Sequence, residues 1–258
     1  MTKKSASTLA AMVAALMVIA SGAFGQTKPK TAKDPLEFVP AGYEVYERFK
    51  GDLNKDGLDD HVLMVRNTDA ENILDCKTCY HKGEVSDREE CMYCRNEELK
   101  LDRNPQGIIV AFKKGDHYEL AMQNLSCFPV EPWQGGTYIP PEKPNVSIKR
   151  GNLFVEYGYR ASGLMHVGKS YNFRYQNSDF ELIGYDYTEY CGGDIGYVNS
   201  INFLSKKRLM RGESGCPWLG EGKRALKEAW ENFTLKKPIR LSEIPDFDNL
   251  SIENMINK

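Results

Sequence analysis

The chain has 258 residues, a net charge of −2 and 11% aromatic residues, among them 14 tyrosines. This small net charge gives no electrostatic basis for binding nucleic acid or an anionic membrane surface, so we expect neither partner. The aromatic content suits half-buried β-strands better than helices.

Residues 1–25 are predicted to be a secretory signal peptide. Lys3 and Lys4 give a positive start, the apolar run at 9–20 is short for a bilayer span, and Ala23 and Gly25 are small residues at a cleavage point before Gln26. We therefore expect an exported protein, periplasmic or extracellular, with an uncleaved membrane anchor as the alternative. Removing 25 residues and two lysines leaves 233 residues with a net charge of −4. No later segment is apolar enough to cross a membrane.

Apolar and alternating segments separated by turn residues predict a series of hairpins after a polar tether at 26–34. We expect strands at 43–49, 60–66, 107–112, 117–122, 145–149, 153–159, 171–175, 180–187, 200–204 and 208–210. Short turns join many of them, as at 113–116, 150–152 and 176–179. The sequence thus predicts a single, mainly β domain over 35–258, an antiparallel meander of hairpins packed as a sandwich or open barrel.

One C-terminal helix is predicted, at 222–233. Apolar residues recur there at helical spacing, and two lysines follow at the end where the helix dipole is negative. The residues of that apolar face are Ala225, Leu226, Ala229, Trp230 and Phe233. We expect this helix to cover an edge or an end of the sheet. The acidic tail at 242–258 is expected to dock as a strap with a short last helix.

An acidic loop lies between the first two predicted strands. Asp52, Asn54, Asp56 and Asp60 stand at positions 1, 3, 5 and 9, with Gly57 at position 6. Side-chain oxygens at this spacing, with a glycine where the chain turns sharply, are typical of a calcium loop. The loop is not an EF-hand, since position 12 is a leucine and not a glutamate. The alternative is an Asx-rich turn without metal.

The segment G-D-L-N-K-D-G-L-D-D resembles the calcium loop D-x-N-x-D-G-x-x-D of FG-GAP and VCBS repeat proteins. With the strand that follows Asp60, the resemblance covers about 16 residues. The resemblance implies a structural calcium ion held by Asp52, Asn54, Asp56, Asp60 and the carbonyl of Leu58. The loop occurs once, whereas a propeller would repeat it in each blade. With its hairpin pattern F-R-Y-Q-N-S-D-F-E-L-I-G, the chain is similar to exported bacterial proteins that carry one such loop ahead of several hairpins, which implies no activity.

Residues 67–104 are predicted to be a cysteine-rich insertion, because they are charged and poor in apolar residues. Cys76, Cys79, Cys91 and Cys94 form two C-x-x-C pairs separated by 11 residues. Four thiolates at this spacing are typical of a tetrahedral zinc site, whereas an oxidising compartment favours two disulfides, and both remain open. A redox-active pair is disfavoured, since the context of a helix N-terminus in a βαβ unit is missing.

The other three cysteines follow separately. Cys191 and Cys216 flank a glycine-rich loop and are expected either to form a disulfide or to be two buried thiols. Cys127 would then be left over. A nucleophilic role would require a nearby base, and the candidates are His117 and His166. We assign no catalytic residue.

The leading functional hypothesis is a non-enzymatic binding or interaction module whose partner is a protein or a glycan. Some aromatic residues are candidates for a sugar-binding face, although core packing is their commoner role. They are Trp133, Tyr138, Tyr157, Tyr159 and Tyr171. The alternative is an envelope enzyme acting on glycan, which would need two carboxyl groups about 5–10 Å apart in a cleft.

Overall fold

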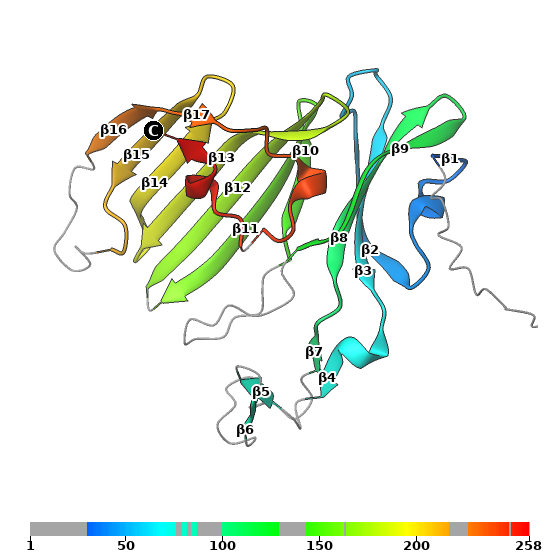
Figure 1. Cartoon of the computed structure of the whole chain (residues 1–258), viewed down its shortest axis with the longest axis horizontal. Helices are drawn as coiled ribbons and strands as arrows, with labels where there is room; N and C mark the ends of the chain where they lie inside the picture. Colours follow the sequence, from blue (N-terminus) through cyan, green and yellow to red (C-terminus); the bar gives the residue numbers. More distant parts are fainter. Residues whose placement is uncertain are drawn as a thin grey trace, which may run out of the picture.

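The computed structural model describes residues 30–75, 79–81, 84–86, 100–128, 143–162, 164–216, 227–247 and 249–257. Most of these residues belong to two antiparallel sheets (Figure 1). The first sheet consists of β1 (Thr31–Ala32), β2 (Tyr43–Gly51), β3 (Asp60–Asn67), β8 (Gln106–Lys114) and β9 (His117–Phe128), in the spatial order β1-β9-β8-β3-β2.

The second sheet is a meander, because each strand pairs with the next strand in the sequence. In both spatial and chain order, it consists of β10 (Asn145–Lys149), β11 (Asn152–Ser162), β12 (Met165–Gln176), β13 (Asp179–Cys191), β14 (Asp194–Asn202), β15 (Lys207–Gly212) and β16 (Glu228–Asn232). The mainly β, antiparallel class predicted from the hairpins is confirmed. The predicted strands fall within observed ones, except that 200–204 runs past the end of β14.

The central strands β3 and β8 of the first sheet are buried on both faces, which explains their unbroken apolar runs. Val62, Met64 and Val110 point into a core shared with the second sheet. Leu63 and Ile109, one residue along, point into a smaller core on the opposite face. That smaller core is closed by β1 and by the 3-10 helix η1 (Pro35–Phe38), whose Ala32 and Phe38 are buried. Successive strand residues point to opposite faces, so both must be apolar where both faces are covered.

Residues 30–34, expected to end a tether, belong to the folded part. Ala32 in β1 pairs with Tyr118 of β9. Asp34 caps η1, since its carboxylate accepts a hydrogen bond from the Leu36 amide at 2.9 Å. A side chain in this position satisfies an amide that has no partner within the helix.

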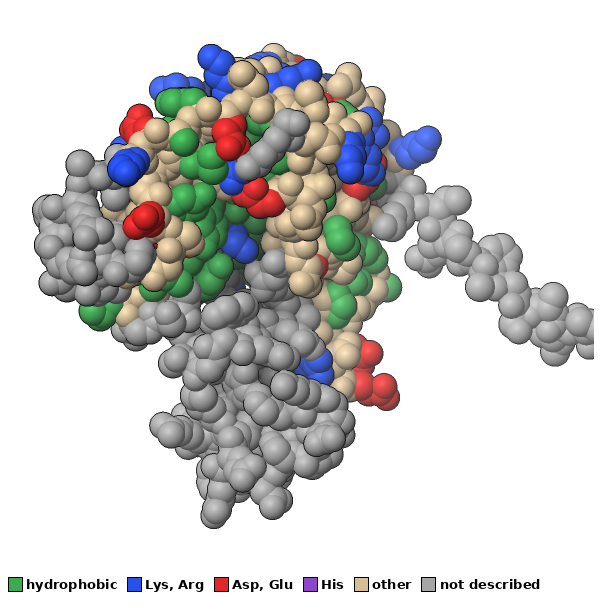
Figure 2. Space-filling model, turned by 60° about the vertical axis from the view of Figure 1, so that its left-hand side comes forward, with side chains coloured by type: hydrophobic (Ala, Val, Ile, Leu, Met, Phe, Trp, Pro, Cys, Tyr) green, Lys and Arg blue, Asp and Glu red, His purple; other side chains and the backbone are tan. Residues whose placement is uncertain are grey.

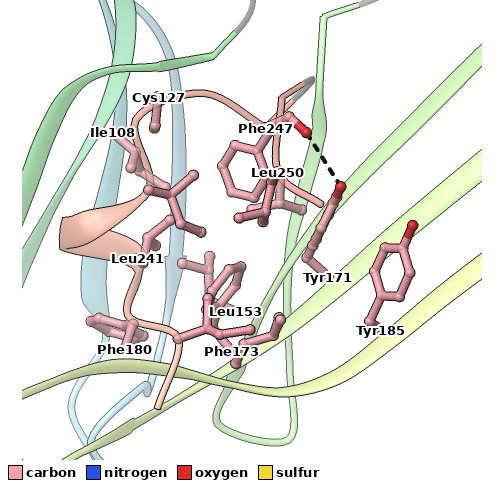
Figure 3. Packing of buried hydrophobic residues seen from close by; sticks show 14 of the residues in the cluster. Ile108, Cys127, Leu153, Tyr171, Phe173, Phe180, Tyr185, Leu241, Phe247 and Leu250 are labelled. Carbon is pink, nitrogen blue, oxygen red and sulfur yellow. Dashed lines mark hydrogen bonds between the residues drawn. The ribbon is translucent and has the colours of Figure 1, made fainter. Parts of the chain in front are cut away.

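The C-terminal segment 234–257, here called the strap, lies across the shared core. It starts in β17 (Thr234–Leu235), passes through the 3-10 helices η4 (Leu241–Glu243) and η5 (Ile252–Asn254), and ends in β18 (Ile256–Asn257), which pairs with β17. Phe247 lies among the aromatic rings of the core, and its carbonyl accepts a hydrogen bond from the Tyr171 hydroxyl at 3.5 Å (Figure 3). The strap expected from the scattered apolar residues is present, with a 3-10 turn where a short helix was expected.

The helix predicted at 222–233 is wrong. Residues 222–226 lie outside the described residues, and Glu228–Asn232 form β16, paired with β15 from Lys207↔Asn232 to Arg211↔Glu228. No α-helix occurs anywhere in the part of the chain that the structure describes. In β16, Ala229 and Trp230 point to opposite faces, and Trp230 is 65% exposed. Pairing with β16 gives hydrogen-bond partners to amide and carbonyl groups of β15 that would otherwise be unpaired at the edge of the sheet. The helical spacing of residues within 222–233 is local and contains no information about this pairing.

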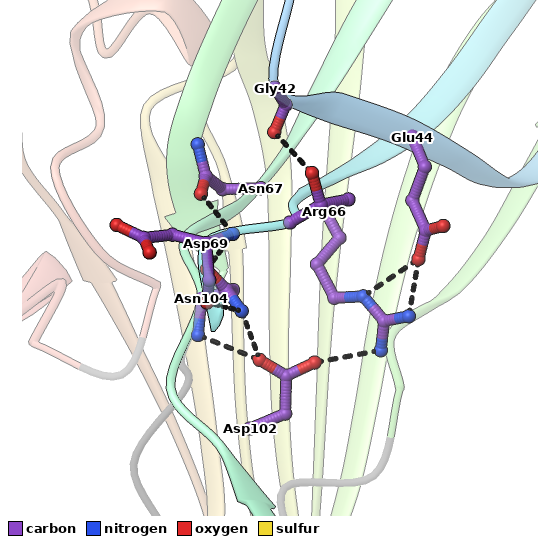
Figure 4. Close-up of polar contacts among 8 residues, drawn as sticks. Gly42, Glu44, Arg66, Asn67, Asp69, Asp102 and Asn104 are labelled. Carbon is purple, nitrogen blue, oxygen red and sulfur yellow. Dashed lines mark hydrogen bonds and ion pairs between the residues drawn. The ribbon is translucent and has the colours of Figure 1, made fainter. Parts of the chain in front are cut away.

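The described strands between β3 and β8 pair with one another and not with the large sheets. β4 (Ile73–Asp75) pairs with β7 (Lys100–Asp102), and β5 (Cys79–His81) pairs with β6 (Glu84–Ser86). They extend from the lower end of the first sheet in the view of Figure 1. A polar network ties the base of the β4–β7 pair to the sheet (Figure 4). The Arg66 guanidinium contacts Asp102 at 3.0 Å and also pairs with Glu44.

Asn104 is the buried centre of this network, with 1% of its surface exposed. Its amide nitrogen donates to the Asp69 carbonyl at 3.0 Å and to Asp102 Oδ1 at 2.8 Å, and its oxygen accepts from the Asp69 amide at 3.0 Å. With both ends of the side chain satisfied, the buried amide fixes where the chain leaves β3 and returns to β8.

We predict that Phe247→Ala lowers the free energy of unfolding by about 3–5 kcal/mol, because it leaves a cavity in the shared core. The Phe247 ring stacks on Phe128 at a centroid distance of 5.6 Å and lies 4.8 Å from Tyr171. Phe154→Ala is the matched control, since Phe154 lies on the outer face of the second sheet under the Lys149 ammonium. Denaturant unfolding measures both. Equal losses would show that the strap contributes little to the core.

Candidate functional site

The acidic loop after β2 is held by its own hydrogen bonds. The Asp52 carboxylate accepts from the amides of Asp56 at 3.1 Å and Gly57 at 3.0 Å, and the Asn54 oxygen accepts from the Asp56 amide at 2.9 Å. Gly57 has φ +86°, in the left-handed region that favours glycine. The sequence therefore places a tight Asx-rich turn here, as both interpretations of the loop require.

Asp60 has a different role from the other carboxylates of the loop. It is fully buried, and its two oxygens accept from the amides of Leu53 at 2.8 Å and Lys113 at 3.0 Å. Burial raises the pKa of this carboxyl, while the two amide bonds act in the opposite direction. Asp60 thus joins the loop to the end of β8, and it holds Leu53, 1% exposed, in the shared core.

The loop lies where the two sheets meet. A Cβ atom on Gly51 would come within 2.9 Å of the Ile148 side chain, and one on Gly151 within 3.0 Å of Lys55. The loop backbone therefore packs against the β10–β11 hairpin of the second sheet. A ligand bound to the loop would therefore affect the contact between the two sheets.

One carboxylate of the loop is engaged by a cation of the chain itself. Lys114 contacts Asp56 Oδ2 at 2.8 Å, and this hydrogen bond lowers the pKa of Asp56. Within the described part of the chain, no three His, Cys, Asp or Glu side chains are close enough together to hold a metal ion. An ion bound at Asp56 would have to replace the Lys114 ammonium there. Leu58, 39% exposed, has its amide bound to Asp56 Oδ1 at 3.0 Å.

The cysteines fall into described and undescribed groups. Cys76, Cys91 and Cys94 lie outside the described residues, and of Cys79 only the backbone is described, in β5. Cys191 and Cys216 form a disulfide, which decides between the two alternatives left open for them. Cys127 is a free, buried thiol, and burial raises its pKa far above the usual range. A thiol that stays protonated is a poor nucleophile, so Cys127 is a core residue.

A group of tyrosines lies on the inner face of the second sheet and borders the strap, where Tyr157 lies 5.7 Å from Phe247. Directly opposed residues of antiparallel strands share a face. Tyr157, Lys169 and Tyr187 stand opposite one another across β11, β12 and β13. The next row on the same face runs across the four strands from Tyr159 to Val167, Glu189 and Tyr197, each residue standing opposite the next. We call Tyr157, Tyr159, Lys169, Tyr187 and Tyr197 the tyrosine face.

These side chains are half-buried and close to each other. The Tyr187 and Tyr197 rings meet edge to face at 6.2 Å, and the Lys169 ammonium lies 5.5 Å from the centre of the Tyr159 ring. Figure 2 shows hydrophobic side chains around a hollow, with a basic side chain among them, on the side that carries the last strands of the second sheet. Burial raises the pKa of Tyr187 and of Tyr197, so both phenols stay protonated and can donate hydrogen bonds.

A buried carboxylate lies on the same face, between Val167 and Tyr197. Glu189 is 3% exposed, and its oxygens accept hydrogen bonds from the Tyr187 hydroxyl at 2.9 Å, the Ser214 hydroxyl at 2.7 Å and the Gly215 amide at 2.7 Å. The Cys191–Cys216 disulfide closes the same loop covalently. Glu189 therefore orients Tyr187 and holds the loop after β15 against β13.

The structure separates Tyr157, Tyr159 and Tyr171, three of the sugar-binding candidates from the sequence. Tyr171 is fully buried under the strap, whereas Tyr157 and Tyr159 are half-buried on the tyrosine face. Trp133 and Tyr138 lie outside the described residues. Lys169, Tyr187 and Tyr197 were missed. Their common face follows from strand register, which sequence spacing alone does not give.

Comparison with known proteins adds no assignment. No family model, curated protein or solved structure matches this chain. The function is therefore inferred from the geometry of the chain itself.

We predict that Asp60→Ala lowers the free energy of unfolding by about 2–4 kcal/mol, because it leaves two buried amides without acceptors. The loss should be the same in excess calcium and in a chelator, since both hydrogen bonds go to the protein backbone. Asp59→Ala is the matched control at an exposed neighbour and should change stability by less than about 0.5 kcal/mol. Thermal unfolding of the three proteins under both conditions measures this. A loss that appears only with calcium would make Asp60 a metal ligand.

Proposed function

We propose that this chain is an exported, non-catalytic binding module that holds a saccharide on its tyrosine face. The observation that carries the proposal is the gathering of four tyrosines and one lysine from β11, β12, β13 and β14 on one face. Aromatic rings offer apolar faces to the C–H groups of a sugar ring, and phenol hydroxyls pair with sugar hydroxyls. The Lys169 ammonium adds a donor for hydroxyl or acidic substituents.

A binding role accounts for the carboxylate at this face better than catalysis does. Glycoside hydrolysis needs two carboxyl groups that reach the bond to be cleaved. Glu189 is almost fully buried and already accepts three hydrogen bonds. Its position suits support of Tyr187, and we assign it no chemical step.

The remaining features are consistent with this proposal. The signal sequence and the Cys191–Cys216 disulfide both suit an oxidising compartment outside the cytoplasm. No helix in the described residues has the length and apolar character to cross a membrane. Of the two arrangements expected, we favour the sandwich, since the two sheets share one core. Cys76, Cys79, Cys91 and Cys94 would clamp the segment after β4 through zinc or two disulfides.

Calcium is proposed as a structural ligand of the acidic loop, on the resemblance to FG-GAP and VCBS loops. Asp52, Asn54 and Asp56 supply hard oxygen donors within one turn, which is the chemistry that calcium prefers. An ion bound there would stiffen the junction between the two sheets. The Lys114 ammonium competes with calcium for Asp56, so Lys114 lowers the affinity of the loop for calcium.

The saccharide proposal predicts that Tyr159→Ala and Tyr197→Ala each weaken binding about tenfold, equivalent to about 1.4 kcal/mol. The purified chain is first screened against an array of oligosaccharides, and the best ligand is then titrated calorimetrically. Tyr190→Ala is the matched control, because Tyr190 is 40% exposed and lies on the opposite face. Absence of binding to any saccharide, or an equal loss with Tyr190→Ala, would reject the proposal.

The calcium proposal predicts that calcium raises the melting temperature and that a chelator lowers it again. At a free calcium concentration 100 times the dissociation constant, the added stability is about 2.7 kcal/mol. Asp56→Ala should abolish the response, whereas Lys114→Ala should increase calcium affinity by removing the competing ammonium. If the melting temperature of the wild-type protein does not respond to calcium, the loop is an Asx-rich turn without metal.

A further inference from the structure

The strap encloses a pocket of its own, separate from the tyrosine face. β17 and β18 pair and bring the two ends of the strap together, from Thr234↔Asn257 to Leu235↔Ile256. Between the outgoing leg with η4 and the returning leg with η5 lies a cavity of about 330 Å³. This volume is within the range of small-molecule pockets, about 300–1,000 Å³.

The pocket has an apolar wall and a basic rim. The wall is formed by Pro238, Ile239, Ile244, Pro245, Leu250 and Met255. The charged residues of the lining are Lys236, Lys237, Arg240 and Glu243, three cations and one carboxylate with a net charge of +2. Apolar surface next to an excess of positive charge suits a ligand with an apolar chain and one anionic end.

The charged residues of the rim differ in the ion pairs that they form. Lys237 contacts Glu243 at 2.9 Å, and Arg240 lies 3.7 Å from Glu243 and 4.0 Å from Glu181. The hydrogen bond from Lys237 lowers the pKa of Glu243, which keeps this carboxylate ionised and its two cations partly neutralised. Lys236 is exposed and has no such ion pair among the described residues. Lys236 is thus the cation of the rim that no carboxylate among the described residues offsets.

We propose that the strap pocket binds a small aliphatic carboxylate, with the alkyl chain against Ile239, Leu250 and Met255 and the carboxylate at Lys236. The pocket is built from one continuous segment whose ends are paired and whose other side is packed in the core. It therefore exists without a partner chain and requires no large rearrangement to fill. An alcohol of the same chain length would share the apolar contacts but lack the charge pair.

The test uses octanoate and 1-octanol as probes of the full-length mature chain labelled with [methyl-13C]methionine. Octanoate should shift the methyl resonance of Met255, assigned through Met255→Leu, in a saturable way. It should bind more tightly than 1-octanol, by up to about fivefold, the scale of one exposed charge pair. If octanoate causes no saturable shift, or if 1-octanol binds equally well, the proposal is overturned.

Two variants locate the carboxylate. Lys236→Glu should weaken octanoate binding about fivefold or more and leave 1-octanol binding unchanged, because only the charged probe meets the reversed charge. Lys207→Glu is the matched control, with the same charge change at an exposed position of β15 away from the pocket lining. An equal effect of the two variants would show that octanoate responds only to net charge, and this overturns the assignment of Lys236. The tyrosine face is not involved, so either result is independent of saccharide binding.

Discussion

The strap is bonded to both sheets, and these bonds hold the two halves of the domain together. On the first sheet, the buried Asn124 side chain of β9 donates to the carbonyls of Leu241 at 2.8 Å and Ile244 at 2.7 Å. The Phe247 amide donates to the Cys127 carbonyl at 3.0 Å. On the second sheet, the amide of Leu182 in β13 donates to the Ile239 carbonyl at 2.8 Å. An irregular segment can be buried only if its backbone groups find such partners.

Side chains of the strap complete the connection at its far end. Arg208 of β15 and Asn199 of β14 both contact the Glu253 carboxylate, and Arg208 Nε also donates to the Asn199 oxygen at 2.8 Å. Arg208 is only 5% exposed, so this charge is paired where water has little access. The apolar side chains of the strap then fill the space between the sheets. It also covers Tyr171 on the inner face of the second sheet and borders the tyrosine face at Tyr157.

Buried polar groups mark the other places where irregular chain meets regular sheet. Asp60 joins the acidic loop to β8, Asn104 holds the base of the β4–β7 pair, and Glu189 holds the loop that carries Cys216. Each of them accepts or donates several hydrogen bonds, so the cost of burying a polar group is offset. A carboxylate of the acidic loop thus has a structural role that needs no metal, while Asp52, Asn54 and Asp56 are the proposed ligands of calcium.

The sequence by itself determined most strands of the two large sheets, their order along the chain and many of the turns between them, because alternation, turn residues and chain direction are local properties. It also determined that the tail would dock, since apolar residues spread through an acidic segment need a place to be buried. It failed at β16, where Ala225, Leu226 and Ala229 recur at helical spacing although Ala229 and Trp230 lie in a strand. Only the tertiary structure decided that this segment forms the edge strand of a sheet. Its hydrogen-bond partners are the backbone amide and carbonyl groups of β15, which is distant in the sequence. Register, equally non-local, placed Lys169, Tyr187 and Tyr197 on one face, and folding brought Cys191 to Cys216.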